Sequence, residues 1–289
     1  MRRFVLPLLL FLLPVSAYGQ ALEVDVLFSD RHRPHVEVVK VLSQAIRAED
    51  IRLFPGLENG NLSEETSQLH TILSRHPDLL VLVGEDALQA ALETHIKIPM
   101  VSVMSMRLNR KMQQQVNISG IDLRPSPALV ADELAHLLPP HAKVLSYYNP
   151  DYSASYINEA GEAFRKQRLQ LFVQPWPEHD VPVALNNSMK PMDAYWMQME
   201  YRSVQPDTLK LLFALARHGK KLIGLSTKYV RAGALIAWSP QLHALGRQTA
   251  KLVNRILEGE RASHIPIQHP EQLKVNIRTQ DTDSGGSDE

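Results

Sequence analysis

The sequence predicts an α/β protein of two similar lobes, each a doubly wound parallel sheet with helices on both faces. Three observations favour this fold class. A chain of 289 residues is long for one hydrophobic core, so two domains of ordinary size are expected. Strand and helix patterns alternate from Leu22 onward, which is typical of parallel sheets. The two halves also repeat the same order of strand, capped helix and strand.

The first half contains short apolar runs separated by amphipathic segments. A helix is expected from Pro34, and a second from Asn61 and Glu64, which have capping-box spacing. Asp86 is the expected N-cap of a third helix, Ala87–Glu93. Strands are expected at Val24–Ser29, Ile51–Phe54, Leu79–Val83 and Ile98–Met104, of which the continuous apolar run Leu79–Val83 fits a sheet centre buried on both faces.

The second half repeats this alternation. Ser126 and Pro127 form a helix start, with serine as N-cap and proline at the first helical position. Ser153 is the expected N-cap of a helix over Ala154–Gln167. Further helices are expected at Val181–Met189 and after Gln205-Pro206, and strands at Lys143–Tyr148, Leu169–Val173, Ala194–Met199 and Leu273–Arg278.

The stretch Lys221–Gly259 predicts a strand, a loop, a second strand and an amphipathic helix. Ser239 and Pro240 repeat the Ser-Pro helix start. The helix that follows has its apolar residues at helical spacing, and Gly259 ends it. The residues of this face are Leu242, Leu245, Thr249, Leu252, Val253, Ile256 and Leu257.

Four motifs follow one another at the end of the chain: Gly233-Ala-Leu, Leu245-Gly-Arg-Gln-Thr-Ala250, Ile256-Leu-Glu-Gly-Glu260 and Ile265-Pro266. In this order and spacing they resemble the corresponding part of bacterial ABC transporter substrate-binding proteins. The branch that they resemble is associated with tryptophan and tyrosine uptake and has the type I periplasmic-binding fold.

The resemblance implies three crossings between the lobes. Asn117–Leu123 would be the first crossing strand. Lobe one would then comprise residues 20–118 and 236–262, and lobe two residues 119–235 and 263–280. Residues 281–289 are acidic and rich in Gly and Ser, so we expect a disordered tail.

The first nineteen residues are interpreted as a cleavable signal peptide. Arg2 and Arg3 precede the apolar run Phe4–Val15, and Ala17-Tyr18-Gly19 supplies small residues before a cleavage site at Gln20. The alternative is a membrane anchor, but the run is shorter than the roughly 20 residues that span a bilayer. A periplasmic location is therefore expected.

Composition narrows the function classes. Lys and Arg together number 31, as do Asp and Glu, and the absence of a basic stripe argues against nucleic acid. The chain has no cysteine, which excludes disulfides, thiolate metal sites and a lipoprotein anchor. His32 and His35 lie near acidic residues, but no tight metal-ligand motif accompanies them. No phosphate loop or nucleophile elbow occurs, so we expect no cofactor, no metal and no enzymatic activity.

Ligand-binding residues are expected after the carboxyl ends of the strands, where loops and helix N-termini converge. Cationic, acidic and aromatic side chains there could contact a carboxylate, an ammonium group and an apolar part of a ligand. The candidates are Ser29, Asp30, Arg31, Glu85, Asp86, Met104, Ser105, Tyr148, Asn149, Ser153, Glu200, Tyr201, Ser226 and Thr227.

The leading hypothesis is a monomeric solute-binding protein that captures a small molecule, for example an amino acid or a related compound, for the permease of an ABC transporter. The segments Glu85-Asp86 and Met104–Arg107 are bulkier and more charged than the small and hydroxyl residues usual in the resembled family. They favour an alternative, in which the protein is a sensory or accessory module that docks on a membrane signalling protein.

Overall fold

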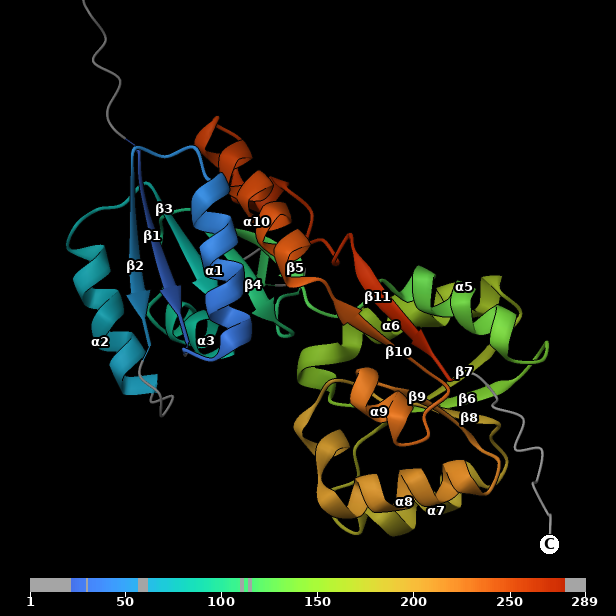
Figure 1. Cartoon of the computed structure of the whole chain (residues 1–289). Coiled ribbons are helices and arrows are strands. Elements are labelled where there is room, and N and C mark those ends of the chain that lie inside the picture. The colour runs from blue at the N-terminus through green and yellow to red at the C-terminus, as the bar shows by residue number, and fades with distance from the viewer. Residues whose placement is uncertain (1–21, 30, 57–61, 110–111, 114–115, 279–289) are drawn as a thin grey trace, which may run out of the picture.

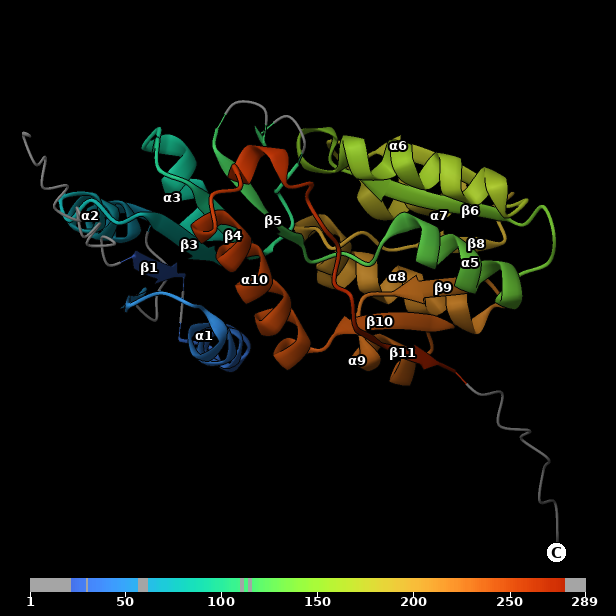
Figure 2. The ribbon, with the colours of Figure 1, turned by 90° about the horizontal axis from the view of Figure 1, so that it is seen from above.

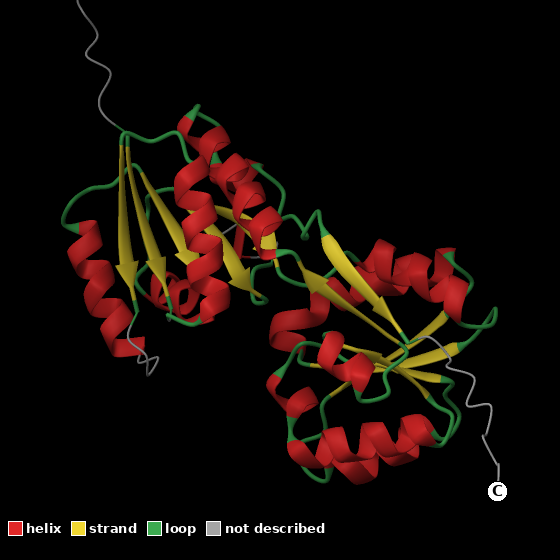
Figure 3. Ribbon diagram, viewed as in Figure 1, coloured by secondary structure: helices red, strands yellow, loops and turns green. Residues whose placement is uncertain are grey.

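The computed structural model describes residues 22–29, 31–56, 62–109, 112–113 and 116–278. They form two α/β lobes, each around its own sheet (Figures 1 and 3). The expected fold class is therefore confirmed. The predicted signal peptide, Asp30 and the acidic tail lie outside the described residues. Within the described part of the chain, no helix combines the length and the apolar character needed to cross a membrane.

The sheet of the first lobe has five parallel strands in the order β2-β1-β3-β4-β5. Its central strand, β3, is buried along its whole length, as the continuous apolar run predicts. The strands are β1 (Glu23–Phe28), β2 (Asp50–Pro55), β3 (Leu79–Val83), β4 (Met100–Ser105) and β5 (Ile118–Asp122). Helices α1 (Arg33–Ala45) and α10 (Leu242–Leu257) cover one face, and α2 (Leu62–Leu73) and α3 (Glu85–Glu93) belong to the other.

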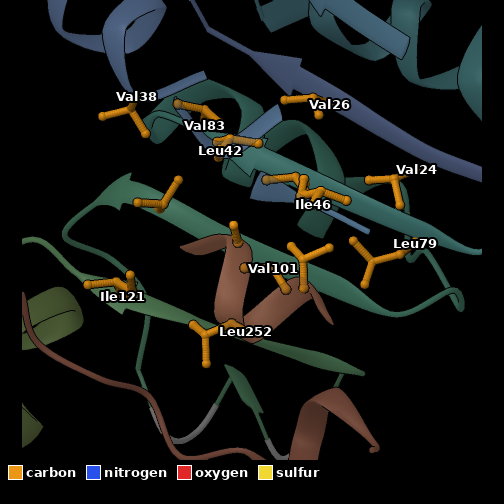
Figure 4. Close-up of a cluster of buried hydrophobic side chains, with 14 of the residues drawn as sticks. Val24, Val26, Val38, Leu42, Ile46, Leu79, Val83, Val101, Ile121 and Leu252 are labelled. Carbon is orange, nitrogen blue, oxygen red and sulfur yellow. The ribbon is translucent and has the colours of Figure 1, made fainter. Parts of the chain in front are cut away.

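The return helix α10 completes the core of the first lobe although it comes more than 100 residues after β5 in the chain. Leu245, Leu252 and Val253 are buried against α1 and the sheet, as the apolar face of the helix predicts. Figure 4 shows this cluster, in which Leu252 lies near Val101 and Ile121.

The sheet of the second lobe has six strands in the order β11-β10-β9-β8-β6-β7, parallel except for β11, which is antiparallel to β10. The strands are β6 (Lys143–Tyr148), β7 (Gln170–Pro175), β8 (Ala194–Trp196), β9 (Lys221–Gly224), β10 (Ile236–Pro240) and β11 (Leu273–Ile277). Helices α5 (Pro127–Leu137) and α6 (Pro150–Lys166) pack on one face. Helices α7 (Val181–Met189) and α8 (Pro206–Arg217) pack on the other. A 3-10 turn at Tyr201–Val204 follows β8, and a second one, at Ala262–His264, follows α10 and packs in the core of the first lobe.

Of the expected N-cap residues, Ser126 is confirmed, whereas Ser239, Ser153 and Asp86 are wrong and Asn61 lies outside the described residues. Ser126 caps α5, with its Oγ accepting from the Leu129 amide. The same dipeptide at Ser239-Pro240 instead belongs to β10, because these residues pair with β11, and α10 begins after Gln241. Asn149, not Ser153, caps α6.

Asp86 is also not an N-cap, because it lies in the first turn of α3. The residue in the N-cap position is Gly84, and the Oγ of Ser29, directly after β1, accepts the hydrogen bond of the Ala87 amide in place of the expected aspartate. The short helix α9 (Thr227–Arg231) was not expected, since this segment was interpreted as a loop.

The lobes are joined by segments at residues 123–125, at Gln241 and at residues 265–272, which lie between elements of the two sheets (Figure 2). Strand β5 pairs with β4, so Ser119–Asp122, placed in lobe two by the sequence, belong to the first sheet. Strand β10 pairs with β9 and β11, so Ile236–Pro240 belong to the second sheet. The resemblance implied both boundaries from the order of motifs, which contains no information on how the strands pair.

Candidate functional site

A cavity of about 430 Å³ lies between the lobes, at the carboxyl ends of β3, β4, β6, β7 and β8. Both lobes and the first crossing contribute to it, as expected for a ligand site in an open α/β sheet. Its lining residues are Glu85, Met106, Arg107, Arg124, Tyr148, Asn149, Pro150, Tyr152, Ser153, Trp176, Met199, Glu200, Tyr201 and Arg202. The cavity communicates with solvent, since Tyr201 is 80% exposed.

Glu200 is one of two carboxylates that line the cavity, and neutral groups hold it in place. Its Oε1 accepts from the Asn149 amide at 3.0 Å and from Ser153 Oγ at 2.6 Å. Its Oε2 accepts from Trp176 Nε1 at 2.6 Å. All three donors are neutral, so none of these hydrogen bonds forms an ion pair with Glu200. A carboxylate has about four lone-pair positions, and one therefore remains for a ligand donor.

Arg124 is a buried cation in the first crossing, with 4% of its surface exposed. Its Nε donates to both oxygens of Asp122, at 2.9 and 3.1 Å, and its Nη1 donates to Ser153 Oγ at 3.1 Å. Burial disfavours the charged guanidinium, but Asp122, together with Tyr156 and Glu200, outweighs burial, and the pKa of Arg124 is raised. The guanidinium also lies over the ring of Tyr156, 4.1 Å from Cζ to the ring centroid.

Glu85 and Arg107 form the first-lobe side of the cavity. Glu85 Oε1 lies 2.7 Å from Arg107 Nε, and Glu85 Oε2 accepts from Ser105 Oγ and the Met106 amide. Arg107 extends toward the second lobe, where it lies over the ring of Tyr152.

Met104 directs this segment, because its φ of 62° is left-handed, which is uncommon for a residue other than glycine. The register of β4 against β5 shifts between Ser102 and Ser105, so the end of β4 departs from the regular ladder.

The structure brings six of the candidate residues together around the cavity: Glu85, Tyr148, Asn149, Ser153, Glu200 and Tyr201. Ser29 and Ser105 are buried and support α3 and Glu85 respectively. Arg31, Asp86, Met104, Ser226 and Thr227 lie outside the lining of this cavity.

Several lining residues were not among the candidates. Trp176 follows β7, so applying the strand-end rule to that edge strand would have identified it. Arg124 lies in a crossing between lobes, where no strand-end rule applies. Met106 and Arg107 stand in the bulky segment after β4, which was noted only as a departure from the resembled family.

The arrangement suits reversible binding. Within the described residues, no three His, Cys, Asp or Glu side chains gather closely enough to hold a metal ion. The lining instead combines aromatic rings with fixed charges: Tyr148, Tyr152, Trp176 and Tyr201 stand among Glu200, Arg124 and Arg202. Such a combination of apolar surface and few placed polar groups is typical of small-molecule sites.

Comparison with known proteins gives one family. The model of the family "ABC transporter substrate binding protein" matches residues 36–282. None of the curated protein sequences matches the chain significantly.

Solved structures of several bacterial proteins have a similar fold. A conserved domain protein from Vibrio cholerae is 17% identical, with a TM-score of 0.58 over 89% of this chain and 92% of that one. An ABC domain from Streptococcus pneumonia in complex with L-Trp is 16% identical, with a TM-score of 0.60 over 88% and 91%. A ligand-free, open substrate-binding protein with adhesive properties from Clostridium difficile is 16% identical, with a TM-score of 0.61 over 88% and 91%.

Proposed function

The chain belongs to the family of ABC transporter substrate-binding proteins, and we propose that it captures a small solute between its lobes and delivers it to the permease of an ABC transporter. The observation that carries this proposal is the cavity lined from both lobes at the carboxyl ends of their strands. A ligand held there contacts both lobes, so its binding energy favours their closure. A permease can then recognise the closed form.

The charges of the cavity support an amino acid or a related zwitterion as the ligand. Glu85 is paired with Arg107 and Asp122 with Arg124. Among the described residues, Glu200 accepts hydrogen bonds from neutral donors alone, and the nearby Arg124 cation acts on it only electrostatically. The Arg202 guanidinium donates to the carbonyl of Pro177 and has no acidic partner among the described residues. An ammonium group on Glu200 and a carboxylate near Arg202 would complement both charges.

The aromatic rings support a ligand with an apolar or aromatic side chain. Tyr148, Tyr152, Trp176 and Tyr201 line the cavity, together with Met106 and Met199. Aromatic rings and thioethers offer broad contact surface for planar groups. L-tryptophan is a suitable first probe, because it is the ligand bound in the similar domain from Streptococcus pneumonia.

A second function, that of an accessory module docking on a membrane signalling protein, is favoured by one observation. Arg107 already bridges an acid and an aromatic ring across the cavity, through Glu85 and Tyr152. A protein that works without a small ligand could be held together by such an internal contact.

Two experiments test the proposal. Native mass spectrometry of the protein purified from the periplasm of its native host looks for a bound small molecule, and calorimetry then measures binding of the standard amino acids. A bound amino acid, and compaction in X-ray scattering when it is added, are expected. Absence of any small molecule and of any change in scattering radius would favour the accessory module.

The proposed location is the periplasm, after cleavage before Gln20. N-terminal sequencing of the protein released by osmotic shock should start at Gln20. A membrane-retained form that still begins at Met1 would contradict this location.

A further inference from the structure

A continuous network of hydrogen bonds runs from the first crossing between the lobes to the wall of the cavity. It consists of Arg124, Ser153 and Glu200. Paired bonds to Asp122 fix Arg124 to the end of β5, which belongs to the first lobe. Arg124 Nη1 donates to Ser153 Oγ at 3.1 Å, and Ser153 Oγ donates to Glu200 Oε1 at 2.6 Å. Ser153 lies on α6 and Glu200 follows β8, so the Arg124–Ser153 bond joins an arginine anchored on the first lobe to the second lobe.

The hydroxyl group of Ser153 makes both hydrogen bonds of this network, the one to Arg124 and the one to Glu200. A serine hydroxyl has one proton to donate and lone pairs to accept with. The proton points to an anion and a lone pair accepts from a cation, so both bonds are charge-assisted. Ser153 is 1% exposed, and solvent therefore has little access to replace either partner.

The third crossing reinforces the position of Arg124. The carbonyl of Arg124 lies 2.9 Å from Nδ1 of His269, whose ring is 5.9 Å from the ring of Tyr156. Tyr156 in turn lies under the Arg124 guanidinium and donates to the carbonyl of Pro125. The backbone and the side chain of Arg124 are thus both held at the point about which the lobes would turn.

Resting on the proposed function, in which Glu200 binds the ammonium group of the ligand, we propose that Ser153 is a positioning residue that couples the angle between the lobes to the orientation of Glu200. Rotation of the first lobe moves Asp122 and Arg124 relative to α6, and so changes the bond that Ser153 accepts. A ligand cation on Glu200 acts on the other bond of the same hydroxyl. Such coupling is reciprocal, because each equilibrium must affect the other to the same extent.

Spin-label distance measurements on the ligand-free protein test this coupling directly. The chain has no cysteine, so Ser67→Cys on α2 and Lys210→Cys on α8, both exposed, give a label pair across the lobes. In this background we compare Ser153→Ala, Ser153→Thr and Ser155→Ala. Ser155 is an exposed serine of the same helix and is the matched control.

Ser153→Ala should shift or broaden the distance distribution, while Ser153→Thr, which keeps the hydroxyl, and Ser155→Ala should reproduce that of the unsubstituted protein. If thermal melting shows that Ser153→Thr is unfolded, the inference is tested by the comparison of Ser153→Ala with Ser155→Ala. A Ser153→Ala distribution identical to that of Ser155→Ala would overturn the inference.

Calorimetry gives the second readout, with L-tryptophan as probe or, where it does not bind, the tightest-binding other standard amino acid. Ser153→Ala should lower the affinity about tenfold, as for loss of a hydrogen bond to a charged group, and Ser155→Ala should leave it unchanged. A changed distance distribution with unchanged affinity would overturn the coupling and leave the proposed function standing. If the unsubstituted protein binds no amino acid, the proposed ligand class fails, and the distance measurement alone decides whether Ser153 controls the angle between the lobes.

Discussion

Arg107 of the first lobe lies over the ring of Tyr152 of the second lobe, with 4.6 Å between its Cζ atom and the ring centroid. Arg107 is held from its own lobe by Glu85, 2.7 Å from Nε to Oε1. The contact therefore connects a guanidinium fixed on one lobe to an aromatic face on the other, beside the cavity that both residues line.

Replacing Tyr152 should release this contact without disturbing the Glu85–Arg107 pair. A cation–π contact at an exposed site is worth about 0.5–1 kcal/mol, so Tyr152→Leu should shift the ratio of lobe conformers about twofold to fivefold toward larger separations. Spin-label distances on the ligand-free protein measure that ratio. Tyr152→Phe keeps the aromatic face and is the control, and equal behaviour of the Phe and Leu variants would contradict the prediction.

Two helical glycines should respond to alanine with opposite signs. Alanine normally stabilises a helix by about 1 kcal/mol relative to glycine, and Gly161 in α6 has open space where a Cβ would stand. At Gly246 in α10 a Cβ would lie 2.8 Å from Val41 Cβ and 3.0 Å from the Val38 carbonyl oxygen of α1. Gly246→Ala should therefore destabilise, by about 1–3 kcal/mol as for other overpacked cores.

Urea unfolding of both glycine variants measures the two effects. Gly161→Ala should move the midpoint to higher urea concentration and Gly246→Ala to lower. A Gly246→Ala midpoint at or above that of the unsubstituted protein would show that α1 and α10 are not in close contact.

Asp25 should make stability depend on pH. It is 1% exposed in β1, and burial raises its pKa to about 6, with Arg52 opposing the shift. The pKa of Asp25 in the folded protein lies above its unfolded value of 3.8. The protonated carboxyl therefore contributes fully to the free energy of unfolding below about pH 4, and this contribution is lost as pH rises through 6. Asp25→Asn mimics the protonated carboxyl, so the free energy of unfolding of this variant should not fall with the ionisation of residue 25.

From pH 4 to pH 7.5, the free energy of unfolding of Asp25→Asn should therefore rise relative to that of the unsubstituted protein. The change should be on the order of 2–3 kcal/mol, from 1.36 kcal/mol per pKa unit. Urea unfolding across this pH range measures it. The control is Asp207→Asn, at an exposed position of α8, which should show no such change with pH. A difference in stability for Asp25→Asn that does not change with pH would contradict the prediction.

The sequence was sufficient for the alternation of elements and for the helix faces, because both depend on local periodicity. Leu245, Leu252 and Val253 were assigned to a buried face from spacing alone, and they are buried. Ser126-Pro127 and Ser239-Pro240 have the same local signal, yet only the first starts a helix. The second pair is held in β10 by Leu273 and Lys274 of β11, and no local pattern predicts that distant pairing.

The strand-end rule identified the part of the cavity that follows β6 and β8, including Asn149, Ser153 and Glu200. It did not identify Arg124, because that residue becomes part of the cavity only when the first crossing is folded against α6. It also included Thr227, which lies in the unexpected helix α9. A rule about sheet edges cannot decide which strand ends face the other lobe, since that depends on the path of the crossings.

Glu200 should be the main electrostatic determinant of ligand affinity. Glu200→Gln keeps the size and planar shape of the side chain but removes the charge that an ammonium group would meet. Hydrogen bonds to charged groups contribute about 1.5–3 kcal/mol, so affinity for an amino acid should fall at least tenfold. Trp176→Phe removes the donor that lies 2.6 Å from Oε2 while retaining an aromatic ring, and a smaller loss of about fivefold is expected.

Calorimetry with L-tryptophan, or with the tightest-binding other amino acid, measures both losses. Asp86→Ala and Thr227→Ala are the controls, because these polar residues lie outside the lining of the cavity and should leave affinity unchanged. Equal losses in Glu200→Gln and Thr227→Ala would place the ligand elsewhere along the strand ends of the second lobe. An unchanged affinity in Glu200→Gln would instead contradict the pairing of a ligand ammonium group with the carboxylate of Glu200.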